Sequence, residues 1–506
     1  MATGRVVRGA LASALVLLAG AGPARALDFI ELKIPLLDTS FNLKLSELAN
    51  PQALLNGRSD LADLNRATGG RVGRELRQLL DTPLPLSLLP VVDQALGSPL
   101  LEQALLVLSS FGSVNGQNTD LSGERLQQVL IQASGQGQPT LLTLLQAIPG
   151  DSVRLDLGRA VELLQRLRRQ QHQAERLLAA GQPSAPPAAS EVLGPLPLRE
   201  RRLKLAVAHR QKPLVVELVE PVRPGRGRLV LLSHGLWDSP ESFRGWARLL
   251  ASRGTTVLMP IHPGSDSGQR QAMLNGKAPP PRPAELRLRP LDLQAVIHAA
   301  ASERLGLAPG SQTGKVVVIG HSWGATTALQ LAGVRPSARQ LAARCHNPAD
   351  PDRNPSWALQ CSWLSDADQA ALADPRVIAV AAVSPPTQLL FDHGAARELS
   401  ARVLLVSGSR DWVVPPDLEA LQPFRGILRR GHQLVLAQGG DHFNLRPGGA
   451  PAGGVLGTLL AAWVEGAFAA GDGVRPGPGA PPLLPAHGWG HAAIPLVDVS
   501  GQLAPL

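Results

Sequence analysis

Short apolar runs alternate with longer segments of mixed polarity between residues 197 and 470. The short runs are rich in Val, Leu and Ile, which predicts strands, and the segments between them predict helices. Such alternation is typical of an α/β fold with a mostly parallel sheet between helices. We predict eight strands, at Lys204–Ala208, Leu214–Leu218, Leu229–Leu232, Thr255–Met259, Val316–Ile319, Val377–Val383, Val403–Val406 and Gln433–Leu436. We predict the main helices at Ser242–Ser252, Pro290–Ala301, Gly324–Ala332 and Val455–Ala469.

The pattern differs in residues 27–157, where leucine-rich segments are interrupted by prolines. Prolines end helices, so this region predicts a small, mainly helical N-terminal domain. Two short strands are expected at its start, at residues 29–34 and 41–45. Residues 27–157 contain no His or Cys, and their acidic residues are scattered, so no catalytic group stands out.

Residues 158–196 predict a connection between the two domains. A helix rich in Arg and Gln is expected from Arg159 to Ala180, followed by a Pro/Ala-rich linker over residues 182–197. The helix suits either packing between domains or peripheral association with an anionic membrane. After residue 470 a Pro/Gly-rich tail, 471–506, is expected to be poorly ordered over part of its length.

Residues 1–26 have the pattern of a signal peptide. Arg5 and Arg8 precede an apolar stretch, and Ala24 and Ala26 suit cleavage before Leu27. We therefore expect a protein that is periplasmic or secreted. An oxidising compartment favours a disulfide between the two cysteines, Cys345 and Cys361, with two buried free thiols as the alternative.

The net charge of the chain adds little to the prediction of function. The formal net charge is +9, but the basic residues are scattered and mixed with acidic ones. We read this as a solvated basic surface and expect no nucleic-acid partner. The oligomeric state is left open.

The strongest chemical signal is Gly320-His321-Ser322-Trp323-Gly324, which follows an apolar strand and precedes a helix. In this context the motif is typical of a nucleophile elbow, in which the serine hydroxyl projects from a sharp turn. The two glycines allow the close approach of strand and helix. We predict that Ser322 is a nucleophile.

A serine hydroxyl needs a base, and the base needs a carboxylate to orient it. His442 and Asp411 each follow a predicted strand, and the carboxyl ends of parallel strands meet at one edge of the sheet. We predict a triad of Ser322, Asp411 and His442. Asp392 is the alternative acid, whereas Asp441 is expected to be part of the loop structure.

Ser233-His234-Gly235-Leu236-Trp237 follows another predicted strand and suits an oxyanion loop. The backbone N–H groups of Leu236 and Trp323 are the expected oxyanion donors, with His234 orienting the loop. The aromatic residues Trp237, Phe243 and Trp323 are candidates for a substrate pocket, with core packing as the alternative for each.

We expect neither a metal nor a cofactor. Asp350-Pro351-Asp352-Arg353-Asn354 is similar to the start of a calcium loop, but Pro355 replaces the required glycine and Cys361 the required glutamate. The stretch between Cys345 and Cys361 is expected to form a turn-rich excursion near the mouth of the pocket.

The elbow and the Ser233–Leu236 motif resemble the α/β-hydrolase superfamily over residues 197–470. More closely, they resemble platelet-activating-factor acetylhydrolase, dienelactone-hydrolase-like esterases and polyester hydrolases. Dienelactone hydrolases proper use a cysteine, so Ser322 favours ester chemistry. The whole chain also resembles a cyanobacterial α/β-hydrolase family with an N-terminal domain of unknown function. The resemblance rests on the signal peptide, the leucine-rich domain with residues 82–86 and 148–149, and the hydrolase domain.

The resulting hypothesis is an exported serine hydrolase, an esterase or lipase-like enzyme that forms an acyl-enzyme intermediate on a small-molecule or lipid ester. An amidase or peptidase on the same fold is one alternative. The other is an envelope lipid-binding or interaction protein with a vestigial hydrolase domain.

Overall fold

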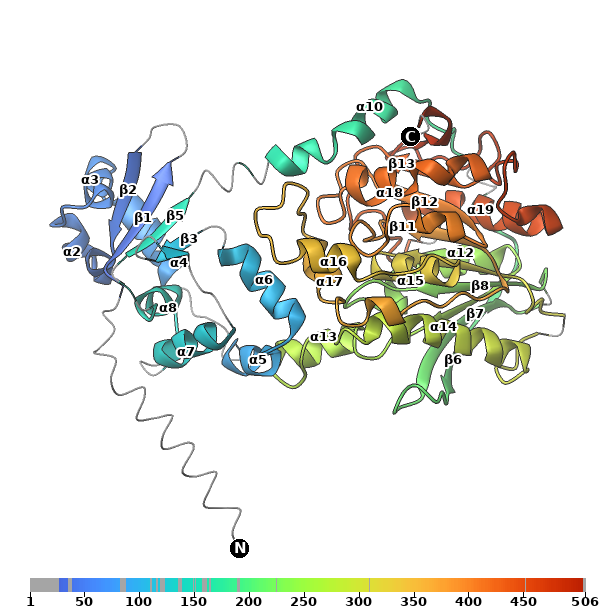
Figure 1. Cartoon of the computed structure of the whole chain (residues 1–506), viewed down its shortest axis with the longest axis horizontal. Coiled ribbons are helices and arrows are strands. Elements are labelled where there is room, and N and C mark those ends of the chain that lie inside the picture. The colour runs from blue at the N-terminus through green and yellow to red at the C-terminus, as the bar shows by residue number, and fades with distance from the viewer. Residues whose placement is uncertain are drawn as a thin grey trace, which may run out of the picture. The chain divides into compact units, whose positions relative to one another are not determined.

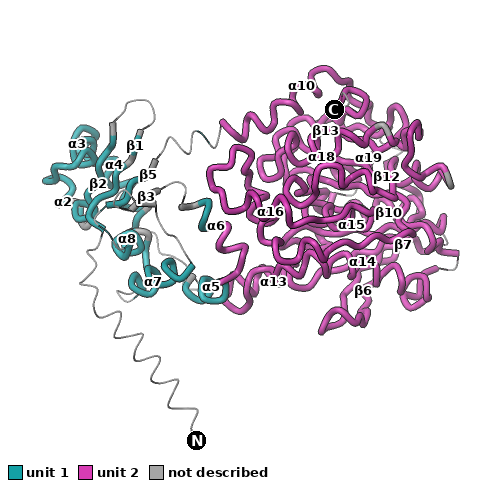
Figure 2. Tube along the Cα trace, viewed as in Figure 1, with its two compact units in different colours: residues 1–96, 105–162 teal, residues 97–104, 163–506 magenta. Residues whose placement is uncertain are grey.

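A computed structural model of the chain describes residues 27–503, apart from residues 35–38, 82–87, 110–111, 115–116, 119–122, 135–138, 149, 151, 157–161, 163–164, 189–191, 224, 309 and 451. The expected signal peptide lies outside the described residues. The chain divides into two compact units, residues 1–96 with 105–162 and residues 97–104 with 163–506 (Figure 2).

Unit 1 contains a five-stranded sheet in the order β2-β1-β5-β3-β4 (Figure 1). The strands are β1 (Phe29–Ile34), β2 (Thr39–Lys44), β3 (Gly112–Val114), β4 (Gln117–Asn118) and β5 (Ser152–Asp156). The sequence predicts only β1 and β2, because the other three strands are short or polar. β5 pairs with β1 in parallel from more than a hundred positions away, a contact that no local pattern reveals.

The predicted leucine-rich helices are present in this part of the chain, and the prolines and glycines between them keep them short. They are α2 (Pro51–Leu55), α3 (Asp60–Ala67), α4 (Arg71–Leu80), α5 (Leu88–Ala95), α6 (Pro99–Ser109), α7 (Gly123–Ser134) and α8 (Leu141–Gln146). The division into units falls within α6. Buried leucines of the first helices, among them Leu54 and Leu61, pack with Leu43 of β2 to form the core of unit 1.

Unit 2 is built on a nine-stranded sheet in the order β14-β13-β12-β11-β10-β8-β9-β7-β6. The pairs from β13 through β9 are parallel, and the pairs at both ends are antiparallel. The strands are β6 (Leu198–Leu205), β7 (Leu214–Pro221), β8 (Arg228–Ser233), β9 (Thr255–Pro260), β10 (Val316–His321), β11 (Val377–Val383), β12 (Arg402–Gly408), β13 (Gln433–Ala437) and β14 (Leu496–Asp498).

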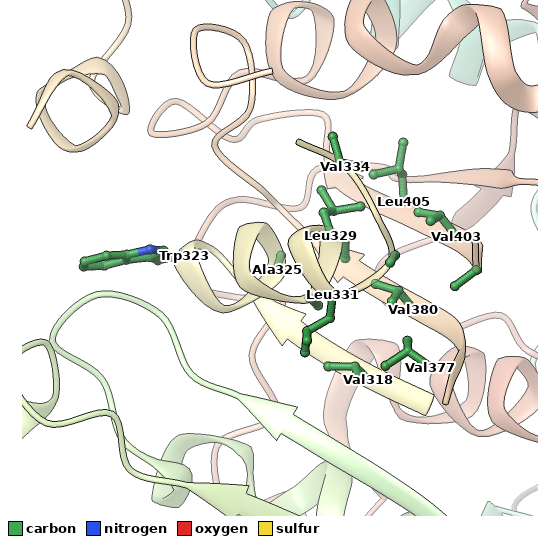
Figure 3. Packing of buried hydrophobic residues seen from close by; sticks show 14 of the residues in the cluster. Val318, Trp323, Ala325, Leu329, Leu331, Val334, Val377, Val380, Val403 and Leu405 are labelled. Carbon is green, nitrogen blue, oxygen red and sulfur yellow. The ribbon is translucent and has the colours of Figure 1, made fainter. Parts of the chain in front are cut away.

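Alternate residues of β10 bury their side chains on opposite faces of this sheet. Val316 and Val318 belong to one apolar cluster, whereas Val317 and Ile319 belong to another. The first cluster includes residues of α14 (Glu285–Ala301) and α15 (Trp323–Leu331), and Figure 3 shows α15 packed on the strand residues. The second includes residues of α12 (Arg244–Ser252) and α19 (Gly457–Ala469). Burial on both faces explains why the strand is apolar without alternation.

The remaining helices of unit 2 are shorter or lie further from the middle of the sheet. They are α10 (His172–Ala180), α13 (Ser267–Leu274), α16 (Arg339–Arg344), α17 (Trp357–Cys361) and α18 (Gln422–Phe424).

The first strand of unit 2 begins earlier than predicted. β6 covers Leu198–Leu205 and pairs antiparallel with β7, with Leu205 opposite Leu214. Residues 206–213 therefore form the turn of the hairpin, which leaves part of the predicted strand, Ala206, Val207 and Ala208, outside β6. Alternating charged residues in β6 conceal the strand, because its outer face is exposed at the edge of the sheet.

Two segments with loop-like composition are packed against unit 2. In the expected linker, the Ser184 N–H donates to the Leu496 carbonyl over 2.9 Å. In the Pro/Gly-rich tail, Leu484 and Trp489 are buried, and β14 adds a ninth strand beside β13. A few buried apolar residues are enough to keep each segment packed. The overall composition of the segments does not reveal these residues.

None of the helices in the described part of the chain is both long enough and apolar enough to cross a membrane.

Candidate active site

Ser322 lies at a sharp turn between β10 and α15. Its backbone has φ 54° and ψ −125°, a strained conformation for a residue with a side chain. A Cβ on Gly320 would lie 2.2 Å from the Gly324 carbonyl oxygen, and one on Gly324 would lie 2.0 Å from the Ser233 carbonyl oxygen. Only glycine fits both positions. The sequence motif thus folds into the strand–turn–helix geometry of a nucleophile elbow.

Asp411 and His442 meet at the same edge of the sheet. Asp411 follows β12 and is fully buried; its Oδ2 lies 3.0 Å from Nδ1 of His442, which follows β13. The other carboxylate oxygen accepts hydrogen bonds from the backbone N–H groups of Val413 and Val414, at 3.0 and 2.8 Å. The carboxylate is therefore held by its own loop and presents one oxygen to the imidazole.

The other acidic candidates have different partners. Asp392, the alternative acid, lies 3.2 Å from Nε of Arg339. Asp441 accepts hydrogen bonds from the N–H groups of Phe443 and Asn444, which stabilises the turn after His442. Geometry therefore favours Asp411 as the partner of His442.

The histidine of the elbow connects the turn of Ser322 to the loop of His442. His321 is buried, and its Nε2 donates to the backbone carbonyl of His442 over 2.9 Å. The two imidazole rings are 4.9 Å apart between centroids. Burial, and secondly the proximity of His442, hold the pKa of His321 well below its usual range, so His321 is neutral.

The loop after β8 lies beside Ser322. A Cβ on Gly235 would be 3.1 Å from the Cβ of Ser322, so this glycine makes the close approach possible. Among the residues that the structure describes, the N–H groups of Leu236 and Trp323 have no hydrogen-bond acceptor, whereas the N–H of Trp237 donates to Ser265 over 2.7 Å. Two unpaired N–H groups beside a serine are the expected features of an oxyanion site.

A family model described as alpha/beta hydrolase fold matches residues 228–359, from β8 through the elbow to α17. This match agrees with the mostly parallel sheet of nine strands and its flanking helices. Unit 2 has the α/β-hydrolase fold. A search of curated proteins finds no match. The family match supports a hydrolase and does not define the bond that it cleaves.

At the end of β8, the α/β-hydrolase unit contains a buried hydrogen-bonded chain that the sequence analysis missed. Nδ1 of His262 lies 2.9 Å from Asp292, and its Nε2 lies 2.9 Å from the hydroxyl of Ser233. All three side chains are almost completely buried, so this second Ser-His-Asp chain is closed to substrate. His262 follows β9 as His442 follows β13, and this position was the signal that could have revealed it.

Asp292 is the centre of the buried network. Burial acts to raise its pKa, but hydrogen bonds from His209, His262 and Arg210 outweigh burial and hold the pKa below its usual range. Arg210 contacts both Asp292 and Glu285, at 2.7 and 2.8 Å. Asp292 is therefore an ionised acceptor that fixes the tautomer of His262.

The predicted pocket residues differ in accessibility. Trp237 is partly buried, and its Nε1 donates to Gln269 over 2.8 Å. Phe243 is 2% exposed and packs between Trp246 and His321, and Trp323 is fully buried. Their contact with a substrate stays a prediction.

Two other aromatic residues, which the sequence analysis did not select, are exposed directly after Asp411 and His442 in the chain. Trp412 and Phe443 are 49% and 50% exposed, and their ring centroids lie 6.4 Å apart. Phe443 also contacts the imidazole of His442 edge-on, at 5.4 Å between centroids. Because large exposed aromatic side chains are costly in water, this pair is a candidate contact surface for an apolar group.

Cys345 and Cys361 form the predicted disulfide. Arg344, which directly precedes the enclosed excursion, pairs with two residues inside it, Asp350 and Asp352, at 2.6 and 2.8 Å. No group of His, Cys, Asp and Glu suited to a metal ion occurs in the described residues.

Proposed function

We propose that the chain is a serine hydrolase of carboxylic esters with Ser322 as the nucleophile, His442 as the base and Asp411 as the residue that orients the base. The hydrogen bond between buried Asp411 and His442, beside the strained elbow, is the observation that carries the proposal. A carboxylate on Nδ1 leaves Nε2 as the nitrogen that exchanges a proton with Ser322.

The proposed reaction has two halves. Ser322 Oγ attacks the ester carbonyl carbon while His442 Nε2 takes the hydroxyl proton, and the resulting oxyanion accepts hydrogen bonds from the Leu236 and Trp323 N–H groups. The tetrahedral intermediate then collapses, and His442 donates the proton to the departing alcohol. Water, deprotonated by the same imidazole, attacks the acyl-enzyme and releases the acid and free Ser322.

Two observations support an ester with an apolar group as substrate. The Ser233–Leu236 loop and the elbow resemble platelet-activating-factor acetylhydrolase and dienelactone-hydrolase-like esterases, and the nucleophile is a serine. In addition, Trp412 and Phe443 are half exposed beside Asp411 and His442 and offer an apolar surface there. Their rings suit an acyl or alcohol group of low polarity.

We further propose that the protein acts outside the cytoplasm. The pattern of residues 1–26 and the disulfide between Cys345 and Cys361 support export, since disulfides persist in oxidising compartments.

The test is the Ser322→Ala variant. We expect it to lose hydrolysis of short p-nitrophenyl esters and covalent labelling by a fluorophosphonate probe. Ser384→Ala is the matched control, because Ser384 is also buried at a strand end with a positive φ of 48°. Retained hydrolysis or labelling in Ser322→Ala would refute the proposal. Faster cleavage of matched anilides than of esters by the wild type would instead identify an amidase.

A further inference from the structure

Arg289 is a buried cation without a carboxylate partner. Its side chain is fully buried in α14, and among the described residues no Asp or Glu forms an ion pair with it. Its Nη2 donates to the backbone carbonyl of His234, whereas Nε and Nη1 have no hydrogen-bond partner. Burial lowers the pKa of Arg289 to about 9, which leaves it charged at neutral pH.

The nearby carboxylates are already occupied by another arginine. Arg210 binds Asp292 through Nε and Nη2, at 2.9 and 2.7 Å, and Glu285 through Nη1 and Nη2, at 2.8 and 2.9 Å. Taking an ion out of water costs several kcal/mol unless other groups compensate for the lost hydration. Pairing with a carboxylate therefore does not explain the position of Arg289.

Both proposed oxyanion donors are adjacent to groups that Arg289 contacts. The guanidinium lies 4.6 Å from the centre of the Trp323 ring, and Figure 3 shows this ring pointing away from the strand residues at the start of α15. Its hydrogen-bond acceptor, the His234 carbonyl, lies just before Gly235 and Leu236. One buried guanidinium thus contacts both the Trp323 side chain and the carbonyl of the loop that leads to Leu236.

His234 links this charge to the donor of Leu236. Its Nε2 accepts a hydrogen bond from the backbone N–H of His262 over 3.0 Å, so the proton of the neutral ring is on Nδ1. Nδ1 then donates to the Gly235 carbonyl over 2.8 Å. That carbonyl belongs to the same peptide unit as the Leu236 N–H, and a hydrogen bond to the carbonyl polarises the N–H.

The protonation state of His234 fits this role. Burial, followed by the charge of Arg289, holds the pKa of His234 well below its usual range. The ring therefore stays neutral with one fixed donor. Because His262 is itself fixed by Asp292, the direction of every hydrogen bond in the chain is determined.

We propose that Arg289 is a positioning residue of the oxyanion site, which fixes the His234–Leu236 loop and favours negative charge on the tetrahedral intermediate. This inference rests on the proposed serine-hydrolase function. Arg289 acts through the backbone of His234 and the N–H groups of Leu236 and Trp323, and does not touch the substrate. A fixed charge in a dry site stabilises a developing anion without reorganisation of solvent.

The experiment uses the full chain with the p-nitrophenyl ester or other acyl substrate that the wild type turns over fastest. Arg289→Met and Arg289→Gln remove the charge, and Arg289→Lys keeps it. Gln keeps an N–H donor and serves as the second neutral variant should Met not fold. The fraction of folded protein is measured by circular dichroism, and kcat is corrected for it.

Arg402 provides a matched control. It too is fully buried, and it donates to the carbonyls of Gly431 and Pro481, at 2.7 and 2.6 Å, with Nη1 unpartnered. Arg402 lies at the start of β12, whereas Asp411 follows the other end of that strand. Arg402→Met is expected to change stability and to leave kcat within about threefold of the wild type, since it removes no donor to the site.

Removal of an oxyanion donor lowers kcat by about 100- to 1,000-fold, so an indirect residue is expected to cause a loss of about 10- to 100-fold. We expect this loss in kcat for both neutral variants, with KM within about threefold of the wild type, because only the anionic tetrahedral intermediate is destabilised. The affinity for a trifluoromethyl ketone inhibitor, whose adduct with the serine is also anionic, should fall in parallel. We expect Arg289→Lys to retain more kcat than Arg289→Gln.

The inference would be overturned by a folded neutral variant with kcat within about threefold of the wild type, by a loss confined to KM, or by an equal loss of kcat in Arg402→Met. These results are distinct from failure of the proposed function. If the wild type hydrolyses no acyl substrate and Ser322 is not labelled by the fluorophosphonate, both proposals fail together.

Discussion

His321 Nε2 donates a hydrogen bond to the backbone carbonyl of His442 over 2.9 Å. The residue before the proposed nucleophile thus holds the main chain of the proposed base. His442 is fixed at two points, by this contact and by Asp411 on its Nδ1. The base can therefore keep its orientation although its loop carries the exposed residue Phe443.

The first prediction concerns this contact. His321→Phe keeps an aromatic ring against Phe243 and His442 but removes the donor, which leaves the His442 carbonyl unpaired. We expect kcat to fall about tenfold with little change in KM, because loss of alignment affects the chemical step. His432→Phe is the control, since His432 is also buried but accepts from Val403 on another part of the sheet. Equal kcat losses in the two variants would contradict the prediction.

The second prediction distinguishes the two candidate acids. Asp411→Asn is expected to lower kcat by about 1,000- to 10,000-fold, because an amide no longer fixes the tautomer of His442. Asp392→Asn removes only the contact with Arg339 and is expected to leave kcat within about twofold, as is usual for an exposed pair. Steady-state kinetics of both variants on one ester provide the measurement. A large loss in Asp392→Asn and a small one in Asp411→Asn would reverse the assignment.

The third prediction concerns the exposed aromatic pair. Trp412→Ala and Phe443→Ala are expected to lower kcat/KM about tenfold for esters with long apolar or aromatic acyl groups, through loss of apolar contact area. Hydrolysis of the acetate ester is expected to change little, because an acetyl group is too small to use the rings. Phe29→Ala in unit 1, where Phe29 is 39% exposed, is the control. Uniform losses across all acyl lengths would argue against a binding role.

The fourth prediction concerns stability and pH. Burial, and secondly the charge of Arg289, lower the pKa of His262 to about 4 from an ordinary value of 6.5. Between these values the unfolded state binds a proton that the folded state does not. The stabilisation from neutral His262 is therefore complete above pH 6.5 and is lost as the pH falls toward 4, by about 2 kcal/mol at pH 5.

Urea unfolding at pH 7 and pH 5 provides the measurement for this fourth prediction. His262→Gln is expected to be less stable than the wild type at pH 7, and its free energy of unfolding should fall less between the two pH values. Asp417, whose pKa burial raises to about 6, acts in the opposite direction but is present in both proteins and cancels in the comparison. Identical changes in the two proteins would show that His262 does not titrate as expected.

The sequence predicts the parts of the fold that are encoded locally. The apolar strand at Val316–Ile319, the glycines around Ser322 and the loops of Asp411 and His442 each carry a recognisable pattern. β14 was missed because its pairing with β13 depends on a few buried residues within a Pro/Gly-rich tail. β5 was missed because its partner is distant in sequence.

The buried network was missed for a different reason. Arg289 and Asp292 lie on α14, whereas His262 follows β9, and each of the three is unremarkable in its local sequence. Their significance depends on complete burial and on the hydrogen-bond partners that His262 and Asp292 have and that Arg289 lacks, and both properties exist only in the folded chain. A sequence motif can therefore predict the groups that react. It is less able to predict the groups that hold the reacting groups in place.

The unpaired charge of Arg289 is expected to lower thermal stability while it raises turnover. Taking an ion out of water costs several kcal/mol, so an apolar side chain of similar volume at this position is expected to stabilise the fold. Directed evolution of this protein for heat resistance alone is therefore expected to favour Met or Leu at position 289, and selection for turnover should restore arginine. Position 289 thus marks where optimising the scaffold and optimising the catalyst lead to different sequences.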